Sequence, residues 1–270
     1  MPHQWIISAL DETWTVLAAQ IRDCSERDFD ALTACPGWSV RDIVSHIIGV
    51  ERESRGEPLP ELTQPLPPYV RNARGAINEA WVVSNRHASA DEIRDEFHEV
   101  THTTLAMMRD LRAEEWGAVI DAPGGTQTRA YAFESRIVDS WIHLQDIRDA
   151  LLEPADDHGV GESVVINRFE ALLPYVWAKR VAAPENALLQ MNLTGLLGRT
   201  VQVRVREGRG VAGAPTSDRP DLEISSDVAL FWRRCAGRIN AEAFLNASAT
   251  DVRGDREIAQ RFVREMAIVQ

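Results

Sequence analysis

The sequence has few cysteines, no long apolar run and no excess of basic residues, and each shortage excludes a class of protein. The three cysteines are widely spaced and odd in number, a pattern that disfavours a disulfide framework and predicts reduced thiols. The apolar runs fall far short of a membrane span, and the first residues lack the basic start and long apolar stretch of a signal peptide. We therefore expect a cytoplasmic protein with no membrane partner.

The charge balance is acidic. The chain carries 29 lysines and arginines against 41 aspartates and glutamates, a formal charge of −12 at pH 7. A surface of that sign repels phosphate backbones, so a nucleic-acid partner is not expected. Local basic patches such as Arg233–Arg234 could still hold a small anion. With 44% hydrophobic and 26% charged residues over 270 positions, the chain is typical of soluble globular proteins with one large domain or two ordinary ones.

Helical spacing of apolar residues dominates the N-terminal part of the chain. Pro36–Gly37 and the prolines between positions 58 and 68 mark breaks between helices. Ser39 followed by Asp42 predicts a capping box at the start of one of them. Helices are predicted over residues 6–21, from 39 onward, 69–83, 90–111 and, after a break at 122–125, 131–151. The four principal helices predict a bundle over residues 1–153.

The character of the chain changes after residue 153. Residues 153–159, polar with proline and glycine, predict a linker. Val201, Val203 and Val205 alternate with polar residues, as in a half-buried strand. Strands are predicted at 188–193, 200–206 and 221–226, with helices at 161–180, 229–236, 241–246 and 255–267. The fold class is therefore mainly α with α+β, a four-helix bundle followed by a small α+β domain over residues 160–270.

The helix predicted over residues 131–151 carries a narrow polar strip on an otherwise apolar surface. A helix that is apolar nearly all round is usually buried, and buried ionisable groups must be paired, hydrogen-bonded or metal-bound. Asp139 and His143 are four residues apart, so their side chains leave the same face one turn apart. They form a candidate ligand pair. The strip consists of Arg136, Asp139, His143 and Asp146.

His46, at the flank of the apolar stripe of its helix, is the candidate for a third ligand. Metal sites in bundles are built from inward side chains on facing helices. Two imidazole nitrogens and a carboxylate leave coordination positions open, as in catalytic zinc sites. The alternative is a buried hydrogen bond between Asp139 and His143 with His46 at the surface. Spacing alone leaves both interpretations open.

Two further motifs favour simpler interpretations. His98-Glu99-Val100-Thr101-His102 matches the zinc-protease pattern, but helix phase places both histidines almost opposite the apolar stripe of their helix, which indicates a solvated pair. The arginine-rich segment 231–238 could clamp a carboxylate, although ordinary surface arginines explain it as well. Cys235 and Cys35 could be nucleophiles, yet no group adjacent in sequence lowers the pKa of either thiol.

The segment from Cys35 to His46 resembles the second-helix signature of the mycothiol-dependent maleylpyruvate isomerase family. Residues 139–148, with their Trp-Ile-His-x-x-Asp-Ile-Arg core, resemble that family's fourth-helix signature. Gly237–Arg238 and Gly254–Asp255 lie in a part similar to the sterol-carrier-like domain of many members. The resemblance covers essentially the whole chain. It implies a DinB-like metal-binding four-helix bundle followed by a sterol-carrier-like α+β domain.

The resemblance also implies the residues of a site. The family's metal ligands carry over to His46, Asp139 and His143, with a divalent metal, most simply zinc. The family usually has glutamate where this chain has Asp139. Because aspartate is one methylene shorter, the resemblance leaves open whether this carboxylate reaches the metal. Asp146 would orient a histidine ligand, with a helix salt bridge near Arg148 as the alternative. Arg238 would hold an anionic substrate or the carboxyl group of mycothiol, the cosubstrate.

The chemistry that follows is that of a metal-bound thiol. A divalent ion deprotonates a coordinating thiol, and the thiolate is the nucleophile. The resemblance thus implies a metal- and mycothiol-dependent thiol transferase or isomerase acting on a small electrophilic substrate in the cytoplasm of actinobacteria. The alternative is a non-catalytic small-molecule or lipid-binding protein of the same fold. The sequence names neither the electrophile nor the oligomeric state.

Overall fold

The computed structural model describes residues 3–62, 64–122, 125–153 and 159–268. The chain divides into two compact units, Met1–Glu162 and Ser163–Gln270. Residues 154–158 of the predicted linker lie outside the described residues. Among the helices that are described, none combines the length and the apolar character needed to cross a bilayer.

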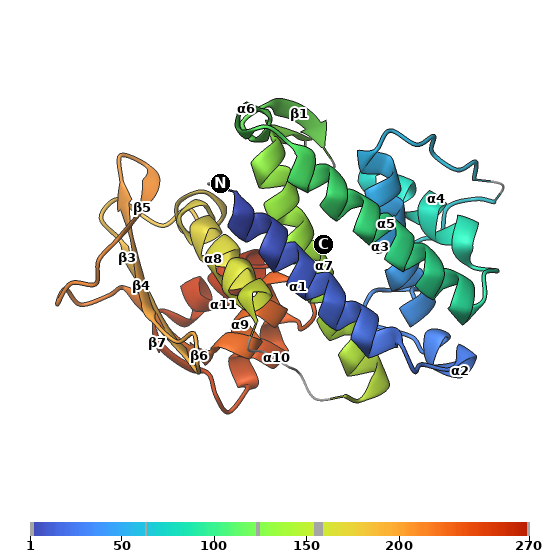
Figure 1. Ribbon diagram of the computed structural model, residues 1–270. Helices are drawn as coiled ribbons and strands as arrows, with labels where there is room; N and C mark the ends of the chain where they lie inside the picture. The colour runs from blue at the N-terminus through green and yellow to red at the C-terminus, as the bar shows by residue number, and fades with distance from the viewer. Residues whose placement is uncertain (1–2, 63, 123–124, 154–158, 269–270) are drawn as a thin grey trace. The chain divides into compact units, whose positions relative to one another are not determined.

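The first unit is a helix bundle (Figure 1). Helix α1 packs against α5 and α7, and α3 packs against the same two helices and against α4. The predicted four-helix bundle is therefore confirmed, with α4 as an addition that covers α3. The four bundle helices are α1 (Gln4–Ile21), α3 (Val40–Ser54), α5 (Ala90–Asp110) and α7 (Arg129–Leu151); the remaining helices are α2 (Glu26–Phe29), α4 (Ala73–Asn85) and α6 (Ala113–Trp116).

The start of α3 is fixed by the capping box that the sequence predicts. The Ser39 side chain accepts a hydrogen bond from the backbone of Asp42, and the Asp42 carboxylate accepts one from the backbone of Ser39. These bonds satisfy two backbone donors that the first turn of a helix leaves unpaired. Because His46 lies two turns further along α3, this cap sets the helical phase at which His46 projects.

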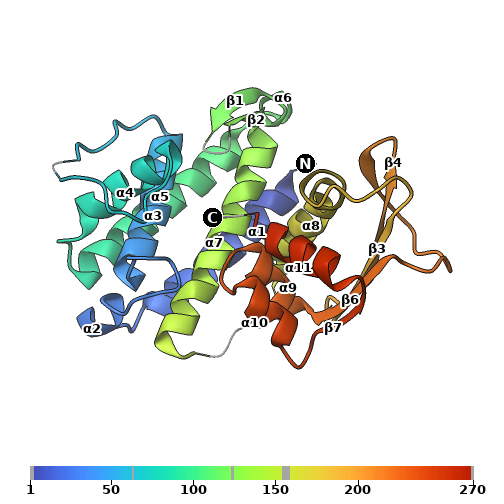
Figure 2. The same cartoon turned by 180° about the vertical axis from the view of Figure 1, so that it is seen from behind.

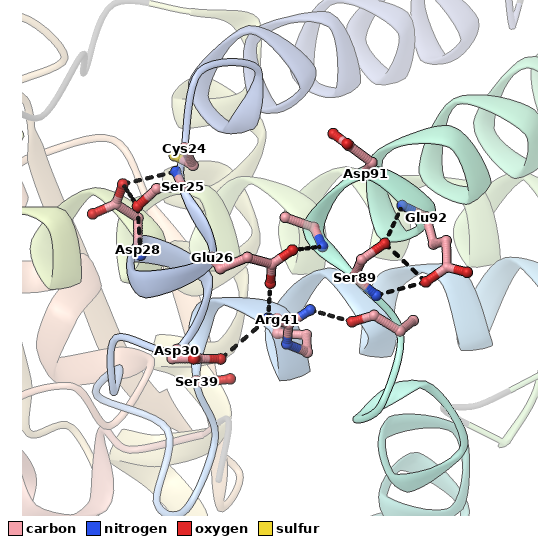
Figure 3. Close-up of polar contacts among 12 residues, drawn as sticks. Cys24, Ser25, Glu26, Asp28, Asp30, Ser39, Arg41, Ser89, Asp91 and Glu92 are labelled. Carbon is pink, nitrogen blue, oxygen red and sulfur yellow. Dashed lines mark hydrogen bonds and ion pairs between the residues drawn. The ribbon is translucent and has the colours of Figure 1, made fainter.

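Arg41 ties α3 to two other elements of the bundle (Figure 3). Its guanidinium donates to Glu26 at 2.7 Å, to Asp30 at 3.1 Å and to the carbonyl of Ala88. Glu26 also accepts a hydrogen bond of 2.7 Å from the backbone of Ala90, the first residue of α5. The capped beginnings of α3 and α5 are thereby held beside α2.

The middle of helix α7 is buried in the bundle, as its composition predicts. Apolar residues on several of its faces, including Ile137, Trp141 and Ile147, are nearly inaccessible to solvent. The indole N–H of Trp14 on α1 donates a 2.9 Å hydrogen bond to the Ser140 hydroxyl on α7, so this polar group has a partner within the packed contact between the two helices. The polar strip of α7 therefore lies within a packed interior.

The segment before α7 departs from the sequence prediction. A short antiparallel hairpin, β1 (Val119–Ala122) and β2 (Gly125–Thr128), precedes α7 where only a break was predicted at residues 122–125. Positions 123 and 124 of that break lie outside the described residues. The strands are only four residues long, Val-Ile-Asp-Ala and Gly-Thr-Gln-Thr, so they are too short to show the apolar alternation by which a strand is recognised in sequence.

The second unit has a five-stranded sheet with helices on one face (Figures 1 and 2). The strand order is β5-β4-β3-β6-β7, antiparallel except for the parallel pair β3 and β6. The predicted α+β class is confirmed. The strands are β3 (Leu188–Thr194), β4 (Thr200–Arg206), β5 (Arg209–Gly213), β6 (Leu222–Asp227) and β7 (Asp251–Gly254); the helices are α8 (Val160–Tyr175), which continues as the π-helical η1 (Val176–Arg180), α9 (Val228–Cys235), α10 (Ala241–Asn246) and α11 (Arg256–Glu265).

The two faces of this sheet differ in polarity. Leu189 pairs with Val203 on one side and with Leu222 on the other, and all three side chains are buried. One residue further along β3, Gln190 accepts a hydrogen bond from Gln202 at 2.7 Å. The alternation places apolar side chains on one face and an amide network on the other.

Candidate metal centre

Helices α3 and α7 bring His46, Asp139 and His143 together; we call these three residues the inner triad. The Nε2 atom of His46 lies 3.3 Å from Asp139 Oδ2, and the Nε2 atom of His143 lies 3.6 Å from Asp139 Oδ1. The two imidazole rings meet edge to face with centroids 5.0 Å apart. Both histidines are buried, whereas about a third of the Asp139 side chain is exposed (36%). The triad is thus accessible from the Asp139 side.

The separations within the inner triad are compatible with the edges of a tetrahedral metal site. Charge-assisted hydrogen bonds are normally about 2.7–2.9 Å long, and 3.6 Å is too long for one. Metal bonds of about 2.0–2.1 Å place neighbouring tetrahedral ligands about 3.3 Å apart, close to the separations found here. Although Asp139 is shorter than glutamate, its carboxylate reaches both histidines.

The charges of the inner triad are complementary. Burial alone would lower the pKa of His143, but the Asp139 carboxylate and the hydrogen bond to Asp146 outweigh it and raise that pKa to about 10. Burial would raise the pKa of Asp139, but His46 and His143 hold it far below its ordinary range. For His46, burial prevails over the attraction of Asp139 and lowers the pKa. Asp139 is therefore ionised, His143 protonated and His46 neutral at pH 7.

Asp146 orients the ring of His143. Its Oδ2 atom lies 3.0 Å from His143 Nδ1, and its side chain is 2% exposed. A carboxylate on the second nitrogen fixes the tautomer and the direction of a metal-binding histidine, and here it leaves Nε2 facing Asp139. The same Oδ2 atom accepts a hydrogen bond from the thiol of Cys35 at 3.5 Å.

Arg136, the fourth member of the polar strip, is paired with Glu51 of α3. Its Nη2 atom donates to Glu51 Oε1 at 2.8 Å, and the Thr104 hydroxyl donates to Oε2 at 3.0 Å. Both charged side chains are buried. Each ionisable group in the strip therefore has an oppositely charged neighbour, as burial requires.

Sequence reasoning did not identify Trp38 or Glu79 as part of the site. The Trp38 ring lies 5.2 Å from that of His46 and 6.5 Å from that of His143, measured between centroids. Its indole donates to Glu79 at 2.9 Å, and the fully buried Glu79 also accepts from the Tyr69 hydroxyl at 2.9 Å. Trp38 thus forms an aromatic wall beside the inner triad. No spacing in the sequence connects positions 38 and 79.

The turn that carries Cys35 and Trp38 requires glycine at position 37. Gly37 has φ +76°, and a Cβ there would lie 2.2 Å from the Tyr69 ring. We expect Gly37→Ala to destabilise the protein by about 1–3 kcal/mol, measured by urea unfolding. The matched control is Gly56→Ala, because Gly56 has φ +79° with open space around it. Equal losses for the two variants would show that the contact with Tyr69 contributes nothing.

The other residues singled out from the sequence lie elsewhere. His98 and His102 are exposed on α5, as helix phase predicts. Arg238 belongs to the second unit, where its Nη1 atom donates to the carbonyl of Ala236 at 2.8 Å. Arg234 is buried, and its guanidinium donates to three backbone carbonyls, so it is structural. Burial raises the pKa of Cys235 far above its ordinary value, which makes this thiol a poor nucleophile.

Comparison with known families identifies two regions of the chain. The sequence model of the mycothiol maleylpyruvate isomerase N-terminal domain matches residues 10–148. The model of the SCP-2 sterol transfer family matches residues 166–266. The first match contains all of the inner triad, and the second contains the sheet with its helices. No curated protein matches the chain in sequence.

Two solved structures have a similar fold. A crystal structure of mycothiol-dependent maleylpyruvate isomerase has a TM-score of 0.57 and 14% identity over 93% of this chain and 93% of that one. A histidine-to-alanine mutant of mycothiol-dependent maleylpyruvate isomerase has a TM-score of 0.58, also at 14% identity, over 88% of this chain and 90% of that one. At this level of identity the likeness establishes the fold.

Proposed function

Because the chain belongs to the family of the mycothiol maleylpyruvate isomerase N-terminal domain, we propose that it is a metal- and mycothiol-dependent enzyme. Its reaction is transfer of the thiol to a small electrophile or isomerisation of that electrophile. The observation that carries the proposal is the inner triad, in which two imidazole nitrogens and a carboxylate lie within 4.8 Å of one another at separations suited to a tetrahedral ion.

Each residue has a role in this proposal. His46, Asp139 and His143 hold a divalent ion, most simply zinc, and leave a position for the thiol. The ion supplies the charge that deprotonates a coordinated thiol and so makes it a nucleophile. Asp146 keeps the His143 ring in place from the opposite nitrogen. Arg238 of the second unit is the proposed partner for an anionic group of the substrate or of mycothiol.

A second candidate function comes from the C-terminal match. The SCP-2 sterol transfer family matches residues 166–266, which favours a protein that holds an apolar ligand while the bundle acts as a scaffold. The two functions differ in what stabilises the fold. An enzyme of the proposed type binds thiol only when a metal is present, whereas a lipid carrier binds its ligand without metal and without thiol.

Thermal unfolding of tag-free protein tests the two functions. Mycothiol at about 100 times its dissociation constant should raise the melting temperature of the zinc-loaded protein by roughly 5–10 °C. S-methylated mycothiol, which cannot form a thiolate, should have little effect. His46→Ala should lose the response to zinc plus thiol, whereas His98→Ala, the exposed control, should keep it. Stabilisation by lipid vesicles, with no response to thiol and zinc, would overturn the proposal.

A further inference from the structure

Cys35, His143 and Asp146 form a second cluster of metal-ligand atoms, which we call the outer triad. A sulfur, a ring nitrogen and a carboxylate oxygen lie within 4.8 Å of one another. The Cys35 Sγ atom is 3.5 Å from Asp146 Oδ2, and the His143 Nδ1 atom is 3.0 Å from the same oxygen. The proposed function uses His143 and Asp146 but gives the thiol no role.

The inner and outer triads share one imidazole. The Nε2 atom of His143 faces Asp139 and its Nδ1 atom faces Asp146. A neutral imidazole has one lone pair and one N–H group. An ion bound to either nitrogen leaves the proton on the other, where a carboxylate accepts it. The two triads are therefore alternatives for a single ion.

We propose that Cys35, His143 Nδ1 and Asp146 form a second, alternative site for a divalent ion. Thiolate, imidazole and carboxylate are the donors that zinc takes in proteins, and the sulfur favours ions of this class over magnesium or calcium. On binding, the thiol proton and the Nδ1 proton of His143 are released to solvent, the sulfur–metal and nitrogen–metal bonds form, and the ring keeps its proton on Nε2. The site stands on its own contacts and does not depend on mycothiol.

The backbone holds the Cys35 thiol beside Asp146. The Cys35 carbonyl accepts a 3.0 Å hydrogen bond from the backbone of Trp38, and the Cys35 amide donates to the Thr33 hydroxyl at 3.2 Å. Cys35 is half-buried, whereas Asp146 and His143 are buried. An ion would therefore enter from the Cys35 side and find two ligands already positioned by their mutual hydrogen bond.

With an ion in the outer triad, the Cys35 thiolate of the protein would be the sulfur ligand, in place of the added thiol that binds the ion in the proposed reaction. An ion in the outer triad leaves His46 out of its coordination. Cys24, which is also half-buried, donates to the Gln20 carbonyl at 3.3 Å and belongs to neither triad. It provides a matched thiol for comparison.

Cobalt(II) titration of tag-free, metal-free protein without added thiol tests the proposal. A thiolate bound to cobalt gives a near-ultraviolet charge-transfer band that imidazole and carboxylate ligands do not give. Wild type, His46→Ala and Cys24→Ser should show the band, and Cys35→Ser should lack it. Wild type should bind a single ion per chain at this centre, because both triads use His143. Thermal melts of each variant would establish that it is folded.

The outcomes separate this proposal from the proposed function. Visible cobalt bands without a charge-transfer band in wild type, lost in His46→Ala, would overturn the outer triad and leave the inner one supported. A charge-transfer band that persists in His46→Ala, together with loss of all cobalt from Cys35→Ser, would support the outer triad and contradict the inner one. A band that survives in Cys35→Ser would assign it to another thiol and overturn the proposal.

Discussion

Replacing Glu51 with alanine is expected to lower the free energy of unfolding by about 3–5 kcal/mol, a large part of the stability of a typical domain. Glu51 is 1% exposed and Arg136 is 8% exposed, so the substitution leaves a guanidinium buried without its counter-charge. The Thr104 hydroxyl loses its acceptor as well. Urea unfolding of the metal-free protein, followed by circular dichroism, measures the loss.

The same helix offers a control for this prediction. Glu53 receives two hydrogen bonds from Arg74, at 2.6 and 2.7 Å, but both side chains are partly exposed. Glu53→Ala should therefore cost only about 0–1 kcal/mol. Replacing both Glu51 and Arg136 with methionine should recover much of the loss, because the unpaired charge is then gone. Similar losses for Glu51→Ala and Glu53→Ala would contradict the assigned role of burial.

The parts of the site that follow from local periodicity could be predicted from the sequence. The polar strip on α7 is visible because Asp139 and His143 are one turn apart on a helix that is otherwise apolar. The capping box of Ser39 fixes where α3 begins. His46 was a candidate third ligand from its position on its helix, and the resemblance supported it. Local spacing could not establish its approach to Asp139, because that depends on how α3 packs against α7. Metal binding by these residues stays a prediction.

The residues that were missed depend on tertiary contacts. Glu79 is 41 positions from Trp38, and Cys35 is 111 positions from Asp146, so no sequence window contains either pair. Glu51 and its partner Arg136 are 85 positions apart. Such pairs depend on which helix faces pack together. The periodicity of the sequence shows which face of each helix is buried, but it does not show which other helix covers that face.

The same distinction applies to the fold. Strand β4 was predicted with its observed bounds because Val201, Val203 and Val205 alternate against a covered face. Strands β5 and β7 were not predicted. Their sequences, Arg-Gly-Val-Ala-Gly and Asp-Val-Arg-Gly, contain few apolar residues, and they become strands through ladder hydrogen bonds to β4 and β6. Edge strands of this kind are set by their partner more than by their own composition.

Metal affinity of the inner triad is expected to rise about tenfold per pH unit between pH 6 and pH 8. His143 carries a proton throughout this interval, because Asp139 and Asp146 raise its pKa to about 10 despite burial. Binding through Nε2 must release one proton from the ring, whereas His46 and Asp139 release none near pH 7. Chelator competition on Cys35→Ser, which retains only the inner triad, measures this slope.

The metal-free protein should show the opposite dependence on pH. The pKa of His143 is raised from its ordinary 6.5 to about 10, so its protonated form stabilises the fold fully below pH 6.5. That contribution is lost as the pH rises from 6.5 towards 10. His143→Gln should flatten the trend, because glutamine does not titrate. Metal affinity that does not change with pH, combined with a flat stability profile for the metal-free protein, would show that His143 is neutral and that Asp139 and Asp146 do not hold its proton.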